Sequence, residues 1–295
     1  MAIFRLEVKT VSRAKGRSAT AAIAYRCGER IKDERTGQIY DYRRKRGVEY
    51  KELIFPSEVK SRSRSEIWNQ AEQAERRRDG VVAREYQLAL PSELSSESRK
   101  NLALVFGKIL TNRYNVVADI AIHKPHPQGD ERNFHAHLLT TSRQVKNDGL
   151  AEKTRILDDK ISGPKEVESL RRIWATLIND AFDKNGIAER VDHRSYQEQC
   201  IDKLPAIHQG PAVTSMERRG EETEIGNLNR EIAKFNLSQS QDLEAERAAR
   251  AQAWAQKKIQ DAIDDRRRQF EEEISLDQLE QQQETEHHQL GGHHV

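Results

Sequence analysis

The sequence predicts an α+β protein with one mostly antiparallel sheet, helices packed against it, and a helical extension that follows. Two observations indicate this architecture. Strand-like and helix-like segments alternate over the first 200 residues, and the connections between them have the length of hairpins or of single helices. Beyond about residue 200 the chain becomes rich in Ala, Arg, Gln and Glu with scattered apolar residues, which is typical of long solvated helices.

The expected strands are short runs in which apolar residues alternate with polar ones or are β-branched. Pro56 and Pro91 each follow such a run, and a residue without a backbone N–H is suited to end a strand. The expected strands span residues 4–8, 39–42, 49–55, 81–90, 119–123 and 133–141.

The expected helices combine apolar periodicity with capping residues. Ser18 is suited to cap the first helix, Gly28 to end it, and Gly186 to close the last. These helices span residues 17–26, 65–78, 95–111 and 166–185. The predicted inward faces comprise Leu102, Val105, Phe106 and Ile109 in the third helix, and Leu170, Ile173, Trp174, Leu177 and Ile178 in the fourth.

We expect two domains, residues 1–215 and residues 216–295. Residues 200–215 contain two prolines and a glycine and are interpreted as an extended linker. Residues 225–285 are expected to form one or two long helices, and the histidine-containing tail from residue 286 is expected to be disordered.

The net charge of +2 conceals an asymmetry between the two halves of the chain. Residues 1–150 contain 29 Lys and Arg against 19 Asp and Glu, a net charge of +10, which leaves −8 for the remainder. The densest basic run is Arg43, Arg44, Lys45 and Arg46. Such a run is either a solvated loop or a contact for phosphates, and the basic half favours a polyanionic partner.

The composition also indicates the cellular compartment in which the protein is expected. No apolar run approaches the roughly 20 residues that a membrane-spanning helix needs. The first residues lack the uninterrupted apolar stretch of a signal peptide, and two cysteines, Cys27 and Cys200, do not indicate a disulfide framework. We therefore expect a cytoplasmic protein that does not insert into membranes.

The most informative residues are His135 and His137, which are two apart in a strand-like segment. Residues i and i+2 of a strand point to the same face, so the two imidazoles project together. His123 ends the preceding strand, and the loop 124–132 can return the chain beside it. A pair of surface histidines is the simpler interpretation, but the third histidine favours a metal site. His126, in the loop between Pro125 and Pro127, is an alternative third ligand with less positional control.

Two further residues are candidates for chemistry at such a site. Three imidazoles form a neutral ligand set, so a metal bound by them keeps its Lewis acidity toward a phosphate. Glu85 lies on a strand where its carboxylate can face the histidines, although a salt-bridged surface role is an equal alternative. Tyr25, a phenol in an Ala-rich helix, is a candidate nucleophile, and its alternative role is structural.

At these residues the chain resembles the MobA/MobL family of plasmid mobilization relaxases, which are HUH endonucleases of the MobQ type. The resemblance spans roughly residues 1–230. The matching motifs are Met1-Ala-Ile-Phe, Arg17-Ser-Ala-Thr-Ala-Ala-Ile-Ala-Tyr25-Arg26, Asp33-Glu-Arg-Thr-Gly, Tyr40-Asp-Tyr, Ala83-Arg84-Glu85, Asp119-Ile-Ala-Ile-His123, Asn133-Phe-His135-Ala-His137, Thr140-Thr-Ser-Arg143, and the segment from His193 to Gly220.

The resemblance implies an HUH relaxase fold and a metal-assisted nick of one DNA strand at a plasmid transfer origin. Tyr25 would be the nucleophile, with Glu85 assisting it or orienting a ligand histidine. His123, His135 and His137 would hold Mn²⁺ or Mg²⁺. The implied partners are single-stranded DNA and a hairpin at the transfer origin, accessory mobilization proteins and a type IV coupling protein. The cations expected to contact DNA are Arg17, Arg26, Arg43, Arg44, Lys45, Arg46, Arg84 and Arg143.

Three other functions are compatible with the sequence. A rolling-circle replication initiator would use the same histidines and a tyrosine, but the order of tyrosine before histidines favours a relaxase. A metal-dependent hydrolase would attack with water and use Tyr25 only for packing. A DNA-binding accessory protein would not catalyse a reaction, and its histidines would only pack.

Overall fold

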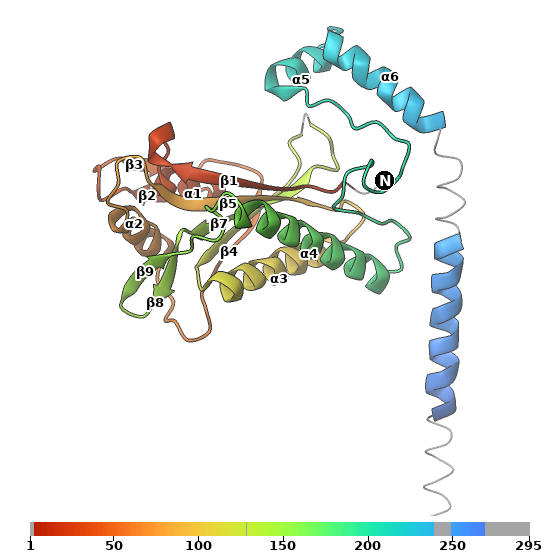
Figure 1. The fold of residues 1–295 in the computed structure, drawn as a ribbon, viewed down its shortest axis with the longest axis horizontal. Helices are drawn as coiled ribbons and strands as arrows, with labels where there is room; N and C mark the ends of the chain where they lie inside the picture. Colours follow the sequence, from red (N-terminus) through yellow and green to blue (C-terminus); the bar gives the residue numbers. More distant parts are fainter. Residues whose placement is uncertain (1–2, 128, 239–248, 269–295) are drawn as a thin grey trace, which may run out of the picture. The chain divides into compact units, whose positions relative to one another are not determined.

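The computed structural model describes residues 3–127, 129–238 and 249–268. Its contacts divide the chain into two compact units, Met1–Pro205 and Ala206–Val295 (Figure 1).

A five-stranded antiparallel sheet forms the centre of the first unit, in the order β1-β5-β7-β6-β4. Every pair of neighbouring strands is antiparallel, which confirms the expected fold class. The strands are β1 (Leu6–Ser12), β4 (Val48–Ile54), β5 (Val81–Leu90), β6 (Ala118–His123) and β7 (Phe134–Thr141).

One face of this sheet carries the larger apolar core. The helices α3 (Ser96–Tyr114) and α4 (Ser162–Lys184) pack there, and Phe106 contacts both Tyr86 of the sheet and Trp174 of α4 edge to face. The predicted inward position of Val105 is wrong, because its side chain is 43% exposed. The buried side of α3 runs through Leu102, Ala103, Phe106 and Leu110, and Val105 falls outside this stripe.

The opposite face is covered by α1 (Ala19–Cys27) and α2 (Arg64–Ala74). Ser18 caps α1 by accepting a hydrogen bond from the N–H of Ala21, and Gly28 ends it with φ 61°, as expected. Ala19 and Ala24 are fully buried. Their small side chains let α1 lie close to the sheet, which brings its backbone within reach of strand side chains.

Two short hairpins and one 3-10 turn complete the first unit. β2 (Arg30–Lys32) pairs with β3 (Ile39–Asp41), β8 (Arg143–Lys146) pairs with β9 (Gly149–Lys153), and η1 covers Arg13–Lys15. Of these elements, only β3 was expected from the sequence. Strands of three to five mostly polar residues carry little periodic signal, and their pairing depends on the turn between them.

The second unit contains α5 (Gly210–Arg218), α6 (Glu224–Ser238) and a helical stretch over residues 249–268. The expected linker over residues 200–215 is wrong in its second part, because α5 begins at Gly210 with a proline in its first turn, where no N–H is required. The expected domain boundary after residue 215 would cut α5, so we propose Pro205 as the end of the first domain. The histidine tail lies outside the described residues.

The helices that the structure describes include none with both the length and the hydropathy to span a bilayer.

Candidate metal centre and active site

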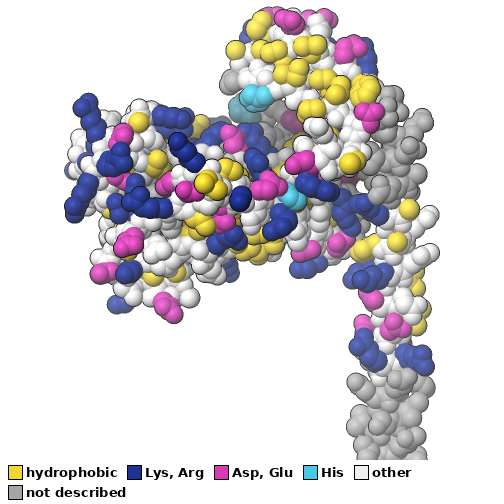
Figure 2. Space-filling view, in the orientation of Figure 1, with side chains coloured by type: hydrophobic (Ala, Val, Ile, Leu, Met, Phe, Trp, Pro, Cys, Tyr) yellow, Lys and Arg dark blue, Asp and Glu magenta, His cyan; other side chains and the backbone are white. Residues whose placement is uncertain are grey.

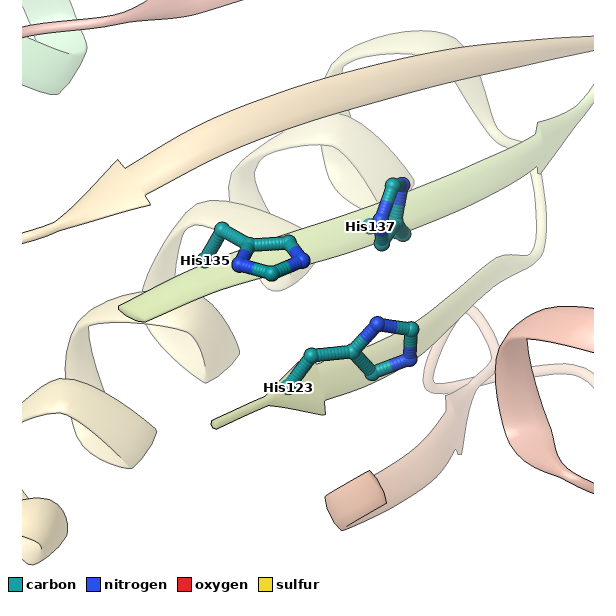
Figure 3. A group of neighbouring side chains, drawn as sticks. All are labelled: His123, His135 and His137. Atoms are coloured by element: carbon teal, nitrogen blue, oxygen red, sulfur yellow. The ribbon is translucent and has the colours of Figure 1, made fainter. Parts of the chain in front are cut away.

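Strand pairing brings three histidines together at one end of β6 and β7. His123 is directly opposite His135 in the register, and His137 lies two residues further along the same face of β7. The candidate ligand atoms of these three residues all lie within 4.8 Å of one another. Figure 3 shows the rings converging from the two strands. Among the described residues, this is the one such group of His, Cys, Asp or Glu, and His126 is not part of it.

Each imidazole forms a hydrogen bond through one ring nitrogen, which leaves the other nitrogen to bind a metal ion. His137 donates from Nδ1 to the Glu85 carboxylate at 2.6 Å. His135 donates from Nδ1 to the carbonyl oxygen of Asn133 at 2.8 Å, and His123 donates from Nε2 to the carbonyl oxygen of Arg26 at 2.7 Å. Metal-binding histidines usually donate their second N–H to a carboxylate or carbonyl in this way. The residues present therefore fit a divalent metal.

Burial keeps two of these rings neutral. Burial lowers the pKa of His123 to about 4, against the raising effect of its hydrogen bond to the Arg26 carbonyl. Burial also lowers the pKa of His137, although Glu85 acts in the opposite direction. A neutral imidazole has a lone pair to offer, whereas an imidazolium has none.

Glu85 is almost fully buried beneath the histidines, at 2% exposure. Burial raises its pKa, but the hydrogen bonds from His137 and Arg26 outweigh that effect and lower the pKa to about 2. The carboxylate is therefore ionised and committed to two partners. It faces the histidine cluster as expected, and it is also salt-bridged, as in the alternative interpretation.

The Arg26 side chain, which we expected to contact DNA, instead binds Glu85 within the protein. Its Nε and Nη2 atoms each donate to an oxygen of Glu85 at 2.5 Å, and its Nη1 donates to the carbonyl oxygen of Ala22 at 3.0 Å. Its guanidinium is thus used within the protein instead of facing DNA. Because its own carbonyl accepts from His123, Arg26 joins the end of α1 to two of the three histidines.

Tyr25, the residue before Arg26, is 50% exposed. Its ring packs edge to face with Tyr42 at 5.2 Å between centroids. The Lys45 ammonium lies 3.7 Å from the centroid of the Tyr25 ring and donates to the Tyr25 carbonyl at 2.9 Å. Burial, assisted by the charge of Arg26, lowers the pKa of Lys45 to about 8. The phenol is therefore accessible, ordered by its neighbours and fixed to the helix end that touches the histidines.

The other predicted DNA contacts separate into two groups. Arg17, Arg43, Arg44 and Arg46 are exposed, with Arg43 paired to Asp41 at 2.6 Å. Figure 2 shows Lys and Arg side chains spread over the end of the first unit where β2 and β3 lie. Arg143 is half-buried and donates to the carbonyl oxygen of Ala151.

Arg84 does not reach the surface. It is 2% exposed and contacts Thr154 and Asp158. Neighbouring residues of a strand point to opposite faces, so Arg84 turns away from the face that carries Glu85. Period-two alternation along β5 was the signal that separates these two residues. Arg84 and Arg26 are therefore both engaged in ion pairs within the protein and are not proposed as DNA contacts.

The chain matches the family model described as the MobA/MobL family over residues 17–219. The chain belongs to the MobA/MobL family. It is 40% identical over 250 residues to the mobilization protein MobL of Acidithiobacillus ferridurans, covering 76% of this chain and 66% of that protein. It is 32% identical over 279 residues to the probable mobilization protein MobA of Bifidobacterium longum, covering 80% and 48%. The chain thus spans less than two thirds of the length of these curated relatives.

A solved structure supports the assignment of the fold. The structure described as "Molecular Basis of Vancomycin Resistance Transfer in Staphylococcus aureus" is 34% identical and superposes with a TM-score of 0.59. The match covers 66% of this chain and 100% of that one. The family-level resemblance seen in the sequence is confirmed by these comparisons.

Proposed function

We propose that this protein is a relaxase that nicks one DNA strand at a plasmid transfer origin during conjugative mobilization. Family membership supports the class of function. The observation that carries the proposal is the junction at Arg26, which ties the helix bearing an exposed tyrosine to a group of three histidines. A metal group and an adjacent phenol are the two components that a tyrosine transesterification needs.

In the proposed step, the Tyr25 oxygen attacks the scissile phosphorus. The bond from Tyr25 Oη to phosphorus forms as the bond from phosphorus to the 3′ oxygen breaks. The phenolic proton passes to solvent water, and the departing 3′ oxygen takes up a proton from solvent water and leaves as a hydroxyl. The 5′ phosphate stays on Tyr25. One phosphodiester is exchanged for another, so the 3′-hydroxyl can later attack and restore the strand without ATP.

The residues around the histidines have supporting roles in this proposal. A divalent metal held by His123, His135 and His137, Mn²⁺ or Mg²⁺, would polarise the scissile phosphate and stabilise its developing charge. Glu85 orients His137, and its low pKa makes it a poor acceptor for a phenolic proton. We therefore assign Glu85 and Arg26 as positioning residues.

The exposed cations near Tyr25 would contact the DNA backbone. The partly buried Lys45 lies against the Tyr25 ring, and its neighbours in the sequence, Arg44 and Arg46, are exposed. Phosphate contacts of this kind hold a strand in register without reading its bases. We propose single-stranded DNA and a hairpin at the transfer origin as the substrate, in the cytoplasm, with accessory mobilization proteins and a type IV coupling protein as further partners.

Trapping a covalent adduct tests the proposal. The protein is incubated with Mn²⁺ and single-stranded DNA from the transfer origin of its plasmid, labelled on the 3′ side of the nick. The mixture is then resolved on a denaturing gel. Label that migrates with the protein is the expected result. Cleaved DNA without an adduct would instead show a hydrolase that uses water, and intact DNA bound by the protein would show an accessory protein.

A further inference from the structure

Two loops that are far apart in the sequence are joined at the start of α1. The first contains η1, and the second is the loop that follows α2. The N–H of Arg13 donates to the carbonyl oxygen of Gly80 at 3.1 Å, and Ser12 Oγ donates to the carbonyl oxygen of Asp79 at 3.1 Å. The Arg13 guanidinium donates to the carbonyl oxygens of Glu75 and Arg77.

Arg13 is the structural centre of this junction. Its side chain is only 12% exposed and forms an ion pair with the fully buried Glu72 at 2.9 Å. The same carboxylate accepts a hydrogen bond from the N–H of Ala19, the first residue of α1. The two loops and the helix start are therefore held together by buried polar contacts.

The junction presents a cluster of five exposed cations, which we call the α1-entry surface. Its members are Lys15, Arg17, Arg76, Arg77 and Arg78. Arg77 pairs with Asp79 at 3.3 Å. Within the described part of the chain, no ion pair involves Lys15, Arg17, Arg76 or Arg78, so a single carboxylate offsets the charge of the five cations. Like charges held together without compensation repel one another, and a bound polyanion offsets this repulsion.

We propose that the α1-entry surface binds the phosphate backbone of the DNA strand, as a second contact separate from the site of cleavage. This inference rests on the proposed function, because it assigns the surface to the same strand. α1 runs from the surface at Ala19 to Tyr25, a rise of about 9 Å at roughly 1.5 Å per residue. A strand that reaches both ends of the helix spans a few nucleotides beyond the scissile phosphate.

The composition of the surface favours nucleic acid over a membrane. Membrane-binding surfaces combine cations with apolar side chains that enter the lipid. Residues 12–18 and 75–80, which form the surface, contain no large hydrophobic residue. Arginine guanidinium groups, which contribute four of the five cations, match the geometry of phosphate oxygens.

The salt dependence of binding tests this proposal with a matched control. The affinity of the wild-type protein for a mixed-sequence single strand of DNA is measured by fluorescence anisotropy at several salt concentrations. The test variant is R76Q/R77Q/R78Q. The control is K165Q/R172Q/K184Q, which removes the same charge from exposed positions of α4. A single strand gives a slope of about −0.7 per phosphate contact in a plot of log affinity against log salt.

The test variant is expected to bind more weakly and to lower the magnitude of the slope by about 2, the value for three contacts. The control should keep the wild-type slope. Equal slopes for test and control variants would overturn the proposal. So would an unchanged slope accompanied by weaker binding of the test variant to phosphatidylserine vesicles, which would assign the surface to a membrane.

The outcome is separable from that of the proposed function. If R76Q/R77Q/R78Q has a reduced salt slope but the wild type forms no covalent adduct, the α1-entry surface is a DNA contact and the relaxase mechanism is rejected. If the wild type forms the adduct but the test and control variants have equal slopes, the relaxase mechanism is kept and the α1-entry surface is rejected as a DNA contact.

Discussion

The Nε2 atom of His123 lies 2.7 Å from the backbone carbonyl oxygen of Arg26. His123 ends β6, and Arg26 follows the proposed nucleophile Tyr25 on α1. A second connection runs from the Arg26 side chain through Glu85 to His137. The position of the phenol is therefore set by the same contacts that orient the candidate metal ligands.

Tyr25→Phe is expected to abolish cleavage and leave DNA binding intact. The phenyl ring keeps the contacts with Tyr42 and Lys45 and loses only the oxygen. Adduct formation and anisotropy measure the two properties. If the variant still forms a covalent adduct, the nucleophile is misassigned, and Tyr40 and Tyr42 become the next candidates.

Removal of divalent metal is expected to stop nicking, and addition of Mn²⁺ or Mg²⁺ to restore it. Three imidazole ligands favour Mn²⁺ over Mg²⁺ in affinity, so Mn²⁺ should act at lower concentration. Calorimetric titration of the metal-free protein with Mn²⁺ provides a readout independent of activity. Full nicking by protein shown to be free of metal would refute a metal role for the histidines.

His123→Ala is expected to lose Mn²⁺ binding and nicking to the same extent as His135→Ala or His137→Ala. His126→Ala is the matched control, because His126 lies in the loop between β6 and β7 and outside the cluster. It should retain most of both properties. Calorimetry on the four variants decides the assignment, and an essential His126 beside a dispensable His123 would move the third ligand into the loop.

Glu85→Gln is expected to weaken Mn²⁺ binding about 10- to 100-fold, because His137 loses the carboxylate that orients it. Glu97→Gln, a change at an exposed position of α3, is the control. If Glu85→Gln keeps the Mn²⁺ affinity of the wild type, Glu85 does not position His137.

Arg26→Gln is expected to lower the free energy of unfolding by about 3 kcal/mol, since it leaves the buried Glu85 carboxylate with one partner fewer. Urea unfolding measures this change in stability.

The contribution of Lys45 to DNA binding is expected to depend on pH. Its pKa is lowered to about 8, so the side chain is charged below that pH and neutral above it. The ratio of the dissociation constants of Lys45→Gln and wild type should therefore exceed one at pH 6.5 and approach one at pH 9.5. Lys45→Arg, which stays charged, should bind equally well relative to wild type at pH 6.5 and better at pH 9.5. A ratio independent of pH would show that Lys45 does not contact the strand through its charge.

Local patterns in the sequence were sufficient for much of the fold. Ser18 and Gly28 bound α1 as expected, because capping depends on a few neighbouring residues. The H-x-H spacing placed His135 and His137 on one face, because strand alternation has a period of two. The boundary of the first domain and the start of α5 were not predictable in the same way, because a Pro- and Gly-containing segment is compatible with both a linker and a helix start.

The sequence by itself determined the fold class, the family motifs and the shared face of His135 and His137, since these follow from short-range periodicity and residue type. Only the tertiary structure placed His123, and not His126, beside that pair, and only it decided which cations are exposed. Arg26 and Glu85 are 59 positions apart, and Arg84 is 70 positions from Thr154. The packing that joins these pairs is not encoded in local spacing, and a buried charge must find its partner wherever the fold places it. Arg26 and Arg84 are therefore engaged inside the protein, while the cations of the α1-entry surface remain exposed.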